Sequence, residues 1–315
     1  MRDSSAVGVL LRRDLPAPLV LASARRAEQL GFDELWVVED LGFRGGIAQA
    51  AAVLAATERI VVGIGILPAA ARSAAFAAME LSTLAELFPE RVIVGIGHGM
   101  PDWMRAVHLW PASPLTAMEE QFDAIRALLV GERVHRDGRY TRIDGVRLET
   151  PPEVMPPLLA GVRGPRSLEL AGRVADGVVL AEPVTPEYLA RVRELMGAPG
   201  RVVAYTVAAV DDDPEAARDT ARPGLAWVGD PDWAPHIAPL PFADELARLR
   251  ERSADRSAFA RALPDDWIDR LAVVGTPESA RSRIAELHRA GASSVVLIPV
   301  GDDATAAMEQ LARAL

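Results

Sequence analysis

Short apolar runs alternate with longer stretches of helical periodicity along most of the chain, and the pair repeats eight times. The runs are continuous in Val, Ile and Leu, which is typical of parallel strands buried on both faces. Eight such units predict a (β/α)8 TIM barrel of the α/β class, with an open doubly wound sheet as the alternative. Strands are expected at residues 7–11, 34–39, 60–67, 91–97, 158–162, 177–181, 202–210 and 294–300. Helices are expected at residues 19–30, 46–57, 73–87, 116–129, 165–175, 186–196, 277–290 and 303–314.

Two segments fall outside this alternation within what we interpret as a single domain, residues 1–315. Residues 134–149 form a short hairpin-like excursion before the fifth strand, with Asp137-Gly138 at its turn. Residues 211–270 are rich in proline, carry Trp227, Trp233 and Trp267, and predict a helical insertion after the seventh strand. Because loops that follow barrel strands lie on the catalytic face, this insertion is placed to act as a lid.

The composition excludes several kinds of site. The chain has no cysteine, and all of its 34 basic residues are arginine. Thiol nucleophiles, Cys-ligated metals, Schiff-base lysines and P-loop lysines are therefore excluded. The five histidines show no H-x-x-x-H or H-x-H spacing, so we expect no metal site. The hydrolase motif G-x-S-x-G is also missing.

Charge and hydropathy narrow the class of partner. The formal net charge is −10, which is unsuited to non-specific nucleic-acid binding. No apolar stretch approaches the roughly 18 residues of a transmembrane helix, and the run at residues 7–11 is too short for a signal sequence. We expect a cytoplasmic protein that acts on a small-molecule substrate, without a nucleic-acid or membrane partner.

Several segments resemble the luciferase-like family of flavin- and coenzyme F420-dependent oxidoreductases. The run LAELFPER at residues 84–91, leading into VGIG at 94–97, is the most specific match. Residues 31–40, 60–68 with Arg72, 161–172, 175–177 and 275–278 are also similar. The resemblance covers most of the chain apart from the insertion and is closest to methylene-tetrahydromethanopterin reductase-like members. It implies a TIM barrel that binds F420, with FMN as the alternative, and a homodimer.

The segment from Gly161 to Arg166 combines a strand end, two glycines and a helix start. Backbone N–H groups and the positive end of the helix dipole converge there, and two arginines add charge. A plain turn with two surface arginines explains the same residues equally well. The resemblance implies that the phosphate side of the cofactor is bound by Gly161, Val162, Arg163, Gly164, Pro165 and Arg166.

Glycines also end the third and fourth strands. Those at residues 63 and 65 permit either a bulge with close backbone approach or tight packing of barrel layers. The resemblance implies a non-proline cis peptide at Gly65–Ile66 that supports the flavin-like ring. Gly65, Ile66 and Gly97 are therefore predicted cofactor contacts. Residues 95–100 are not a dinucleotide loop, because Met100 replaces the third glycine of G-x-G-x-x-G.

Three side chains at strand ends are candidates for proton chemistry. Glu39 and Asp40 close the second strand, and His98 follows the fourth. Paired carboxylates raise one pKa, and an imidazole exchanges protons near neutral pH. The alternatives are a solvated carboxylate pair with Arg44 as partner, and a histidine bonded to a loop carbonyl. The resembled family usually has Asp-His where this chain has Glu39-Asp40.

These inferences favour an oxidoreductase that transfers a hydride between coenzyme F420 and a small organic substrate, which would enter past Trp103 and the insertion. An FMN-dependent luciferase-like monooxygenase is the first alternative, because the same geometry suits either cofactor. The departure from Asp-His keeps a non-catalytic flavin- or deazaflavin-binding protein open. A sugar-processing barrel would need two facing carboxylates, for which Glu39, Asp40 and Glu182 are the strand-end candidates.

Overall fold

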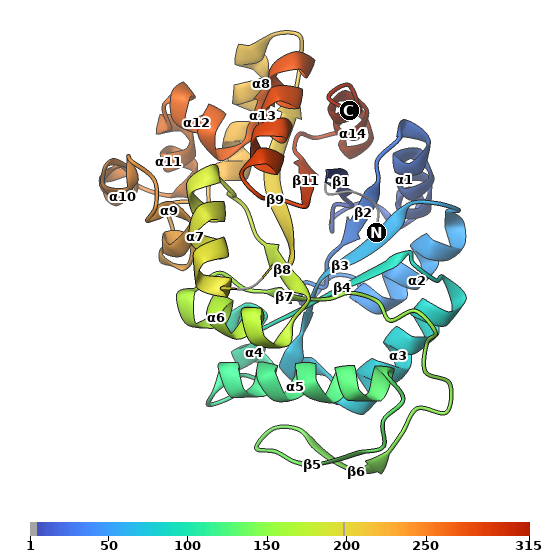
Figure 1. The fold of residues 1–315 in the computed structure, drawn as a ribbon. Helices are drawn as coiled ribbons and strands as arrows, with labels where there is room; N and C mark the ends of the chain where they lie inside the picture. The colour runs from blue at the N-terminus through green and yellow to red at the C-terminus, as the bar shows by residue number, and fades with distance from the viewer. Residues whose placement is uncertain (1–4, 198) are drawn as a thin grey trace.

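A ring of parallel strands surrounded by helices forms the body of the computed structural model, which describes residues 5–197 and 199–315 (Figure 1). The predicted TIM barrel is confirmed. Its strands are β1 (Ala6–Leu10), β2 (Glu34–Val37), β3 (Val61–Pro68), β4 (Val92–Gly97), β7 (Leu158–Gly161), β8 (Gly177–Leu180), β9 (Arg201–Val210) and β11 (Ser294–Pro299). The helices around them are α1 (Ala17–Leu30), α2 (Gly46–Ala56), α3 (Ala74–Leu87), α4 (Pro101–Ala106), α5 (Pro114–Leu129), α6 (Pro165–Val174), α7 (Pro186–Met196), α13 (Pro277–Arg289) and α14 (Ala304–Ala312).

Strand β9 closes the barrel by pairing in parallel with β8 on one edge and β11 on the other. The structure adds a further parallel strand that the sequence pattern does not predict, β10 (Val273–Gly275). It pairs with residues 208–210 of β9, beyond residues 201–204 that pair with β8. Three residues are too few to show a periodicity. The expected second strand also ends earlier, at Val37, so Glu39 and Asp40 lie in the loop that follows it.

Side chains fill the inside of the barrel. Trp36 on β2 and Tyr205 on β9 meet edge to face, with ring centroids 5.6 Å apart. Gly63 on β3 provides the space, because a Cβ there would lie 2.3 Å from the Trp36 indole. The packing interpretation of the third-strand glycines therefore holds at Gly63.

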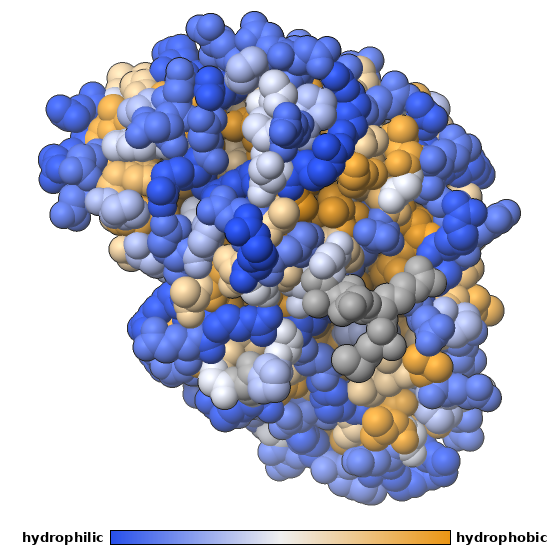
Figure 2. All heavy atoms as spheres, turned by 45° about the horizontal axis from the view of Figure 1, so that its top comes forward, coloured by the Kyte–Doolittle hydropathy of each residue, from blue (hydrophilic) through white to orange (hydrophobic). Residues whose placement is uncertain are grey.

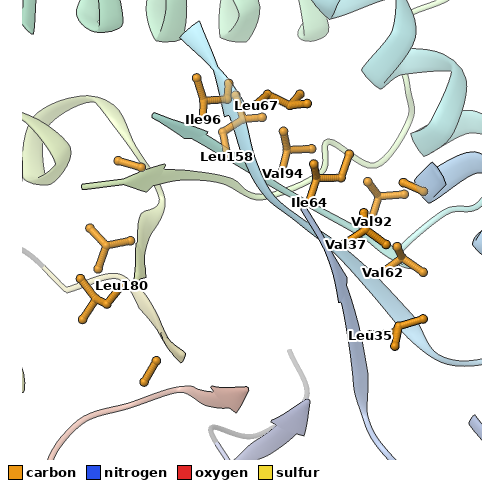
Figure 3. Packing of buried hydrophobic residues seen from close by; sticks show 14 of the residues in the cluster. Leu35, Val37, Val62, Ile64, Leu67, Val92, Val94, Ile96, Leu158 and Leu180 are labelled. Carbon is orange, nitrogen blue, oxygen red and sulfur yellow. The ribbon is translucent and has the colours of Figure 1, made fainter. Parts of the chain in front are cut away.

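A larger hydrophobic cluster lies between the strands and the helices. Figure 3 shows Leu35, Ile64 and Val94 on three neighbouring strands, with their side chains on the side of the barrel wall that faces the helices. They belong to one cluster with Val53 of α2 and Leu81 of α3, and all of these residues are fully buried. Burial on both faces explains why the apolar runs in the sequence are continuous.

One buried carboxylate ties together strands at the N-terminal end of the barrel. Glu34, only 2% exposed, accepts hydrogen bonds from Trp36 Nε1 at 2.8 Å and from Ser294 Oγ at 2.7 Å. It also forms an ion pair with Arg201. Arg201 is the first residue of β9 and Ser294 is the first residue of β11, so this network joins both strands to β2. It lies at the N-terminal end of the barrel, where conserved contacts serve stability in TIM barrels.

The excursion before β7 is an antiparallel hairpin made of β5 (Val134–Asp137) and β6 (Arg142–Val146), drawn below α5 in Figure 1. Its turn begins at Asp137-Gly138. The carboxylate of Glu120 on α5 accepts hydrogen bonds from the backbone N–H groups of residues 139–141 at 2.8 to 2.9 Å. The hairpin is thereby held against α5, outside the barrel.

The segment between β9 and β10 is helical and has a hydrophobic core of its own. Its helices are α8 (Pro214–Ala221), η2 (Arg222–Leu225), η3 (Pro231–Trp233), α9 (Ala234–Ile237), α10 (Ala243–Arg252), α11 (Arg256–Ala262) and α12 (Asp265–Leu271). Leu225, Phe259 and Ile268 pack there with Val207 of β9 and Val274 of β10. The extended end of β9 and its partner β10 thus hold this insertion beside the barrel, at the upper left of Figure 1.

The surface combines charged residues with scattered apolar groups. Figure 2 shows a face covered mainly by hydrophilic side chains, with hydrophobic ones gathered in smaller patches. On α3, Phe76, Met79 and Leu87 are each at least half exposed, and we call these three residues the α3 stripe. Within the described ranges, none of the helices has the length and hydropathy needed to cross a bilayer.

Candidate active site

Backbone from three strands meets at one end of the barrel. The pairing of β3 with β4 shifts register between Ile64 and Leu67, and the Gly65–Ile66 peptide within this bulge is cis, as the family resemblance implies. A Cβ on Gly161 would lie 2.4 Å from Ile66 Cγ2, and a Cβ on Gly97 would lie 2.4 Å from the carbonyl oxygen of Gly161. The structure therefore brings Gly65, Ile66, Gly97 and Gly161 together.

Tyr205 lies against this bulge, and sequence reasoning does not identify it. A Cβ on Gly65 would lie 2.1 Å from the Tyr205 hydroxyl oxygen, so the space beside Gly65 is filled by protein. This hydroxyl is buried and has no hydrogen-bond partner within residues 5–197 and 199–315. Burial, together with nearby carboxylates, raises the pKa of Tyr205 well above its ordinary value. A neutral hydroxyl donor is therefore held at the site, in a strand whose apolar sequence gives no signal of it.

Glu39 is already engaged by its neighbours. Its carboxylate accepts two hydrogen bonds from the Arg72 guanidinium, at 2.5 and 2.7 Å, and one from the Gly46 backbone N–H at 2.7 Å. It therefore caps the start of α2 and binds Arg72, which lies four residues after the end of β3. A catalytic role for Glu39 stays a prediction, and these contacts favour a positioning role.

Asp40 is partnered by a residue from the first loop of the barrel. Its carboxylate forms an ion pair with Arg13, whose guanidinium also lies 4.8 Å from the centroid of the Phe43 ring. The predicted pairing of these carboxylates with Arg44 is wrong. The Arg44 guanidinium instead donates to the backbone carbonyls of Arg13 at 3.0 Å and Leu15 at 2.6 Å, because the β1 loop lies closer to it.

His98 connects two of the predicted segments. Its Nε2 lies 3.0 Å from the hydroxyl of Ser167, in the first turn of α6. Burial lowers the pKa of His98, so the imidazole is neutral at pH 7. The expected alternative, a bond to a loop carbonyl, is wrong, since the partner is a side-chain hydroxyl. A neutral imidazole in this position either accepts or donates one hydrogen bond at the mouth of the barrel, by which we mean the end where the C-terminal ends of the strands lie.

The start of α6 is open. Gly164 precedes the helix and provides no side-chain cap, and nothing lies within 4 Å of the position its Cβ would occupy. Pro165 is the first helical residue, and Arg166 next to it is exposed without an ion pair inside the described part of the chain. Val162, by contrast, is buried in the hydrophobic cluster. The predicted phosphate segment therefore contributes a free cation and an uncapped helix end.

Arg163 is turned away from Arg166 toward the insertion. Its guanidinium stacks 4.7 Å from the Trp233 ring centroid and donates to the Asp232 carbonyl at 3.2 Å. Trp233 in turn lies 6.2 Å from the Trp227 ring, which carries Arg256 at 3.7 Å on its face. The two arginines predicted to act together are therefore separated, and Arg163 fastens the insertion to the β7 loop.

The insertion also forms hydrogen bonds with the loop after β8. Trp233 Nε1 donates to the carbonyl of Glu182 at 2.7 Å, and His236 Nδ1 donates to the carbonyl of Pro183 at 3.1 Å. His236 is fully buried and its ring lies 4.3 Å from that of Tyr188. Burial, reinforced by the charge of Arg163, lowers the pKa of His236 to about 3. Trp233 and His236 form a W-x-x-H sequence in the insertion, and this spacing is the one sequence signal that could have indicated their shared contact with the loop.

No group of three His, Asp or Glu side chains comes together as a metal site in the described ranges. The chemistry available at the mouth is therefore that of carboxyl, imidazole, guanidinium and phenol groups around a backbone bulge.

The fold and the position of these residues define a TIM-barrel protein whose candidate site lies at the C-terminal ends of the strands. Residues 11–294 match the model of the luciferase-like monooxygenase family, and the chain belongs to that family. The expected family resemblance is thereby confirmed.

Individual relatives are similar over different shares of the chain. A 5,10-methylenetetrahydromethanopterin reductase of Methanolobus tindarius is 28% identical over 305 residues, which span 92% of this chain and 93% of that protein. An F420-dependent glucose-6-phosphate dehydrogenase of Beutenbergia cavernae is 36% identical over 181 residues, 53% of this chain and 52% of that protein. The structure of the coenzyme F420-dependent tetrahydromethanopterin reductase from Methanopyrus kandleri shares the fold, with a TM-score of 0.82, 22% identity and coverage of 98% and 97%.

Proposed function

We propose that this protein is an oxidoreductase that exchanges a hydride between coenzyme F420 and a small organic substrate. The observation that carries the proposal is the open start of α6, where Gly164 leaves the helix uncapped beside the exposed Arg166. A phosphate-bearing cofactor is suited to this place, because N–H groups at a helix start and a guanidinium both favour anions. The names of the relatives favour F420 over other phosphate-bearing cofactors.

The residues at the mouth fit such a cofactor. Arg166 and the first turn of α6 would hold its phosphate, and the Gly65–Ile66 bulge would support its ring. The buried Tyr205 hydroxyl, which lacks an acceptor in the described part of the chain, offers a donor near that bulge. When bound, the deazaflavin supplies the hydride-transfer chemistry, while the protein binds, orients and excludes water.

Binding distinguishes this proposal from the FMN-dependent alternative. Purified protein titrated with oxidised F420 should change the polarisation of the deazaflavin fluorescence in a saturable way, and a parallel titration with FMN should show weaker binding. Tight binding of FMN without binding of F420 would overturn the choice of cofactor in favour of the monooxygenase. Tight binding of F420 without oxidation of reduced F420 by any of a panel of ketones, aldehydes and imines would favour the non-catalytic alternative.

The homodimer is part of the same proposal. Three large apolar side chains of the α3 stripe are exposed on one helix at spacings of three and eight residues, which places them on one side. Exposed apolar groups of this kind favour contact with another protein surface. A second copy of the chain is the partner that the family resemblance implies.

The insertion is proposed to form one wall of the substrate entrance. Its contacts through Arg163, Trp233 and His236 fix it to the loops after β7 and β8. This anchoring favours a stationary wall on that side, and the role of Trp103 on α4 in the substrate entrance stays a prediction.

A further inference from the structure

Three carboxyl groups follow barrel strands at the mouth as candidates for proton chemistry, and two of them are occupied. The Glu39 carboxylate is bound by Arg72 and by the Gly46 N–H, and the Asp40 carboxylate is paired with Arg13. Glu182, after β8, has its own backbone N–H as hydrogen-bond donor and no side-chain donor within the described residues. Of the three, it is the carboxyl group that remains available to a bound molecule.

Two hydrogen bonds from the insertion hold the backbone of Glu182 and of Pro183, the residue that follows it. The Trp233 indole binds the carbonyl of Glu182, and His236 binds the carbonyl of Pro183. Two residues further on, Thr185 is buried and caps α7. A side chain on such a fixed backbone loses little further entropy when it contacts a ligand, which is what a reacting group requires.

The surroundings of the Glu182 carboxyl come from several strands. Arg163 of the β7 loop, Asp40 of the β2 loop and Arg13 of the β1 loop all act on it electrostatically. It acts in turn on the Tyr205 hydroxyl of β9. Glu182 follows the last residues of β8, so it lies on the face where the barrel strands end, the same face as the Gly65–Ile66 bulge that Tyr205 contacts.

We propose that Glu182 is the catalytic acid and base of this site, and this inference rests on the proposed function. In reduction of a carbonyl or imine, the proton of Glu182 moves to the substrate oxygen or nitrogen while the substrate carbon receives the hydride supplied by the reduced deazaflavin. The C–H bond of the hydride donor, the C=X π bond and the O–H bond of Glu182 break, and new C–H and X–H bonds form, so the deazaflavin is oxidised by two electrons and the substrate is reduced by two. Water then returns a proton to the carboxylate, and oxidation of an alcohol or amine runs the same steps in reverse.

The environment of Glu182, which is only partly exposed, supports this assignment. Desolvation raises the pKa of the carboxyl, and the charge of Asp40 acts in the same direction, whereas those of Arg163 and Arg13 oppose it. His236, the other titratable group that packs against this loop, is neutral because burial lowers its pKa. A carboxyl that keeps its proton at higher pH than an exposed glutamate is suited to donate it.

Infrared spectroscopy of the protein without cofactor tests the protonation directly. The wild-type protein should show the carbonyl stretch of a protonated carboxyl at pH values above about 5, where exposed glutamates are ionised. Glu182→Gln should lose this band. Glu194→Gln is the matched control, since Glu194 lies on the helix that follows the same loop and pairs with Arg191 on the surface. Absence of the band from the wild-type protein would overturn the proposal.

Single-turnover oxidation of reduced F420 by simple ketones, aldehydes and imines tests the catalytic role. Glu182→Gln should slow the hydride step by about 100-fold or more and abolish the decline of the wild-type rate at high pH, while F420 affinity changes little. Glu182→Asp, which keeps the acid and serves if the glutamine variant folds poorly, should retain the pH-dependent decline. A wild-type rate and pH profile in Glu182→Gln would overturn the proposal.

The two measurements separate this inference from the proposed function. Failure of the wild-type protein to bind F420 would remove the proposed function, and the infrared band would still decide whether Glu182 holds a proton. F420 turnover that is insensitive to Glu182→Gln would leave the proposed function standing and remove the role of Glu182.

Discussion

The indole N–H of Trp233 donates a 2.7 Å hydrogen bond to the backbone carbonyl of Glu182, and the same ring carries the Arg163 guanidinium 4.7 Å from its centroid. One side chain of the insertion therefore contacts the loops after both β7 and β8. The position of these two loops depends on the insertion being folded.

Replacing Trp233 with phenylalanine should loosen the β8 loop. The ring stack is largely kept, but the carbonyl of Glu182 loses its donor, which costs about 1 kcal/mol. Hydrogen exchange should accelerate at the amides of Glu182, Val184 and Thr185. Trp227→Phe is the control, because Trp227 belongs to the same stack and has no bond to this loop. Equal exchange in both variants would show that the hydrogen bond is unimportant.

Protonation of His236 should destabilise the protein in acid. The pKa of His236 is lowered to about 3 in the folded state from an ordinary value of 6.5, so the unfolded state binds the proton first. The stability that this neutral imidazole contributes is complete above pH 6.5 and is lost as pH falls toward 3, by up to about 1.4 kcal/mol per pH unit.

Urea titrations of wild type and His236→Phe across this pH range check that prediction. Carboxylates titrate in both proteins, so the difference between the two curves isolates the histidine. The free energy of unfolding of the variant should be lower at pH 7 and should fall less steeply below pH 6.5. Parallel curves would contradict the assigned neutral state.

Arg166→Gln should weaken binding of F420 about tenfold to a hundredfold, because a charged hydrogen bond to phosphate contributes about 1.5–3 kcal/mol. Arg173→Gln is the matched control, since it makes the same change in charge at the other end of α6, where Arg173 pairs with Glu119 and bonds to the Glu169 carbonyl. Fluorescence titration at fixed ionic strength measures both. Equal losses in the two variants would indicate a general field effect in place of a phosphate contact.

Glu34→Ala should destabilise the barrel by on the order of 3 kcal/mol. The substitution removes the acceptor of Trp36 and Ser294 and the counter-charge of Arg201 from a buried position. Thermal or urea unfolding gives the change. Glu309→Ala, which breaks an exposed pair with Arg26, should have a small effect by comparison. A loss at Glu34 as small as that at Glu309 would refute the role of this network.

Phe76→Glu should convert the proposed dimer into a monomer. Phe76 is 65% exposed within the α3 stripe, and a carboxylate in the centre of an apolar contact is unfavourable. Size-exclusion chromatography with light scattering measures the mass. Phe43→Glu is the control, because Phe43 is also half exposed but lies on the site loop after β2. A wild-type protein that is monomeric at micromolar concentration would contradict the proposal.

The barrel is predictable from the sequence because eight buried strands leave eight continuous apolar runs. Turn and cap signals at Gly31, Thr185 and Thr276 also mark helix ends correctly. Strand β10 is not predictable in this way, because its three residues make sense only as partners of the protruding end of β9.

The candidate site is predictable as a region, while its contacts are not. The position of Asp40 close after the second strand follows from the pattern, but its pairing with Arg13 depends on two loops, and the two residues are 27 positions apart in the sequence. Likewise, the split between Arg163 and Arg166 arises from the fold of the insertion, which brings Trp233 to one of them. Residues such as Tyr205 are hidden because a tyrosine in an apolar strand has the signature of an ordinary core residue.

Strands β8 and β10 both pair with β9, on the same edge and at different residues. The first residues of β9 close the barrel against β8, and its last residues pair with β10 and carry the insertion. The insertion is thus attached to the strands through a short backbone ladder and an apolar cluster, separate from the hydrogen bonds that close the barrel. A different segment between residues 210 and 273 could leave the barrel closed if it kept the pairing of β9 with β10. It would also have to replace Trp233 and His236, because these side chains hold the loop after β8.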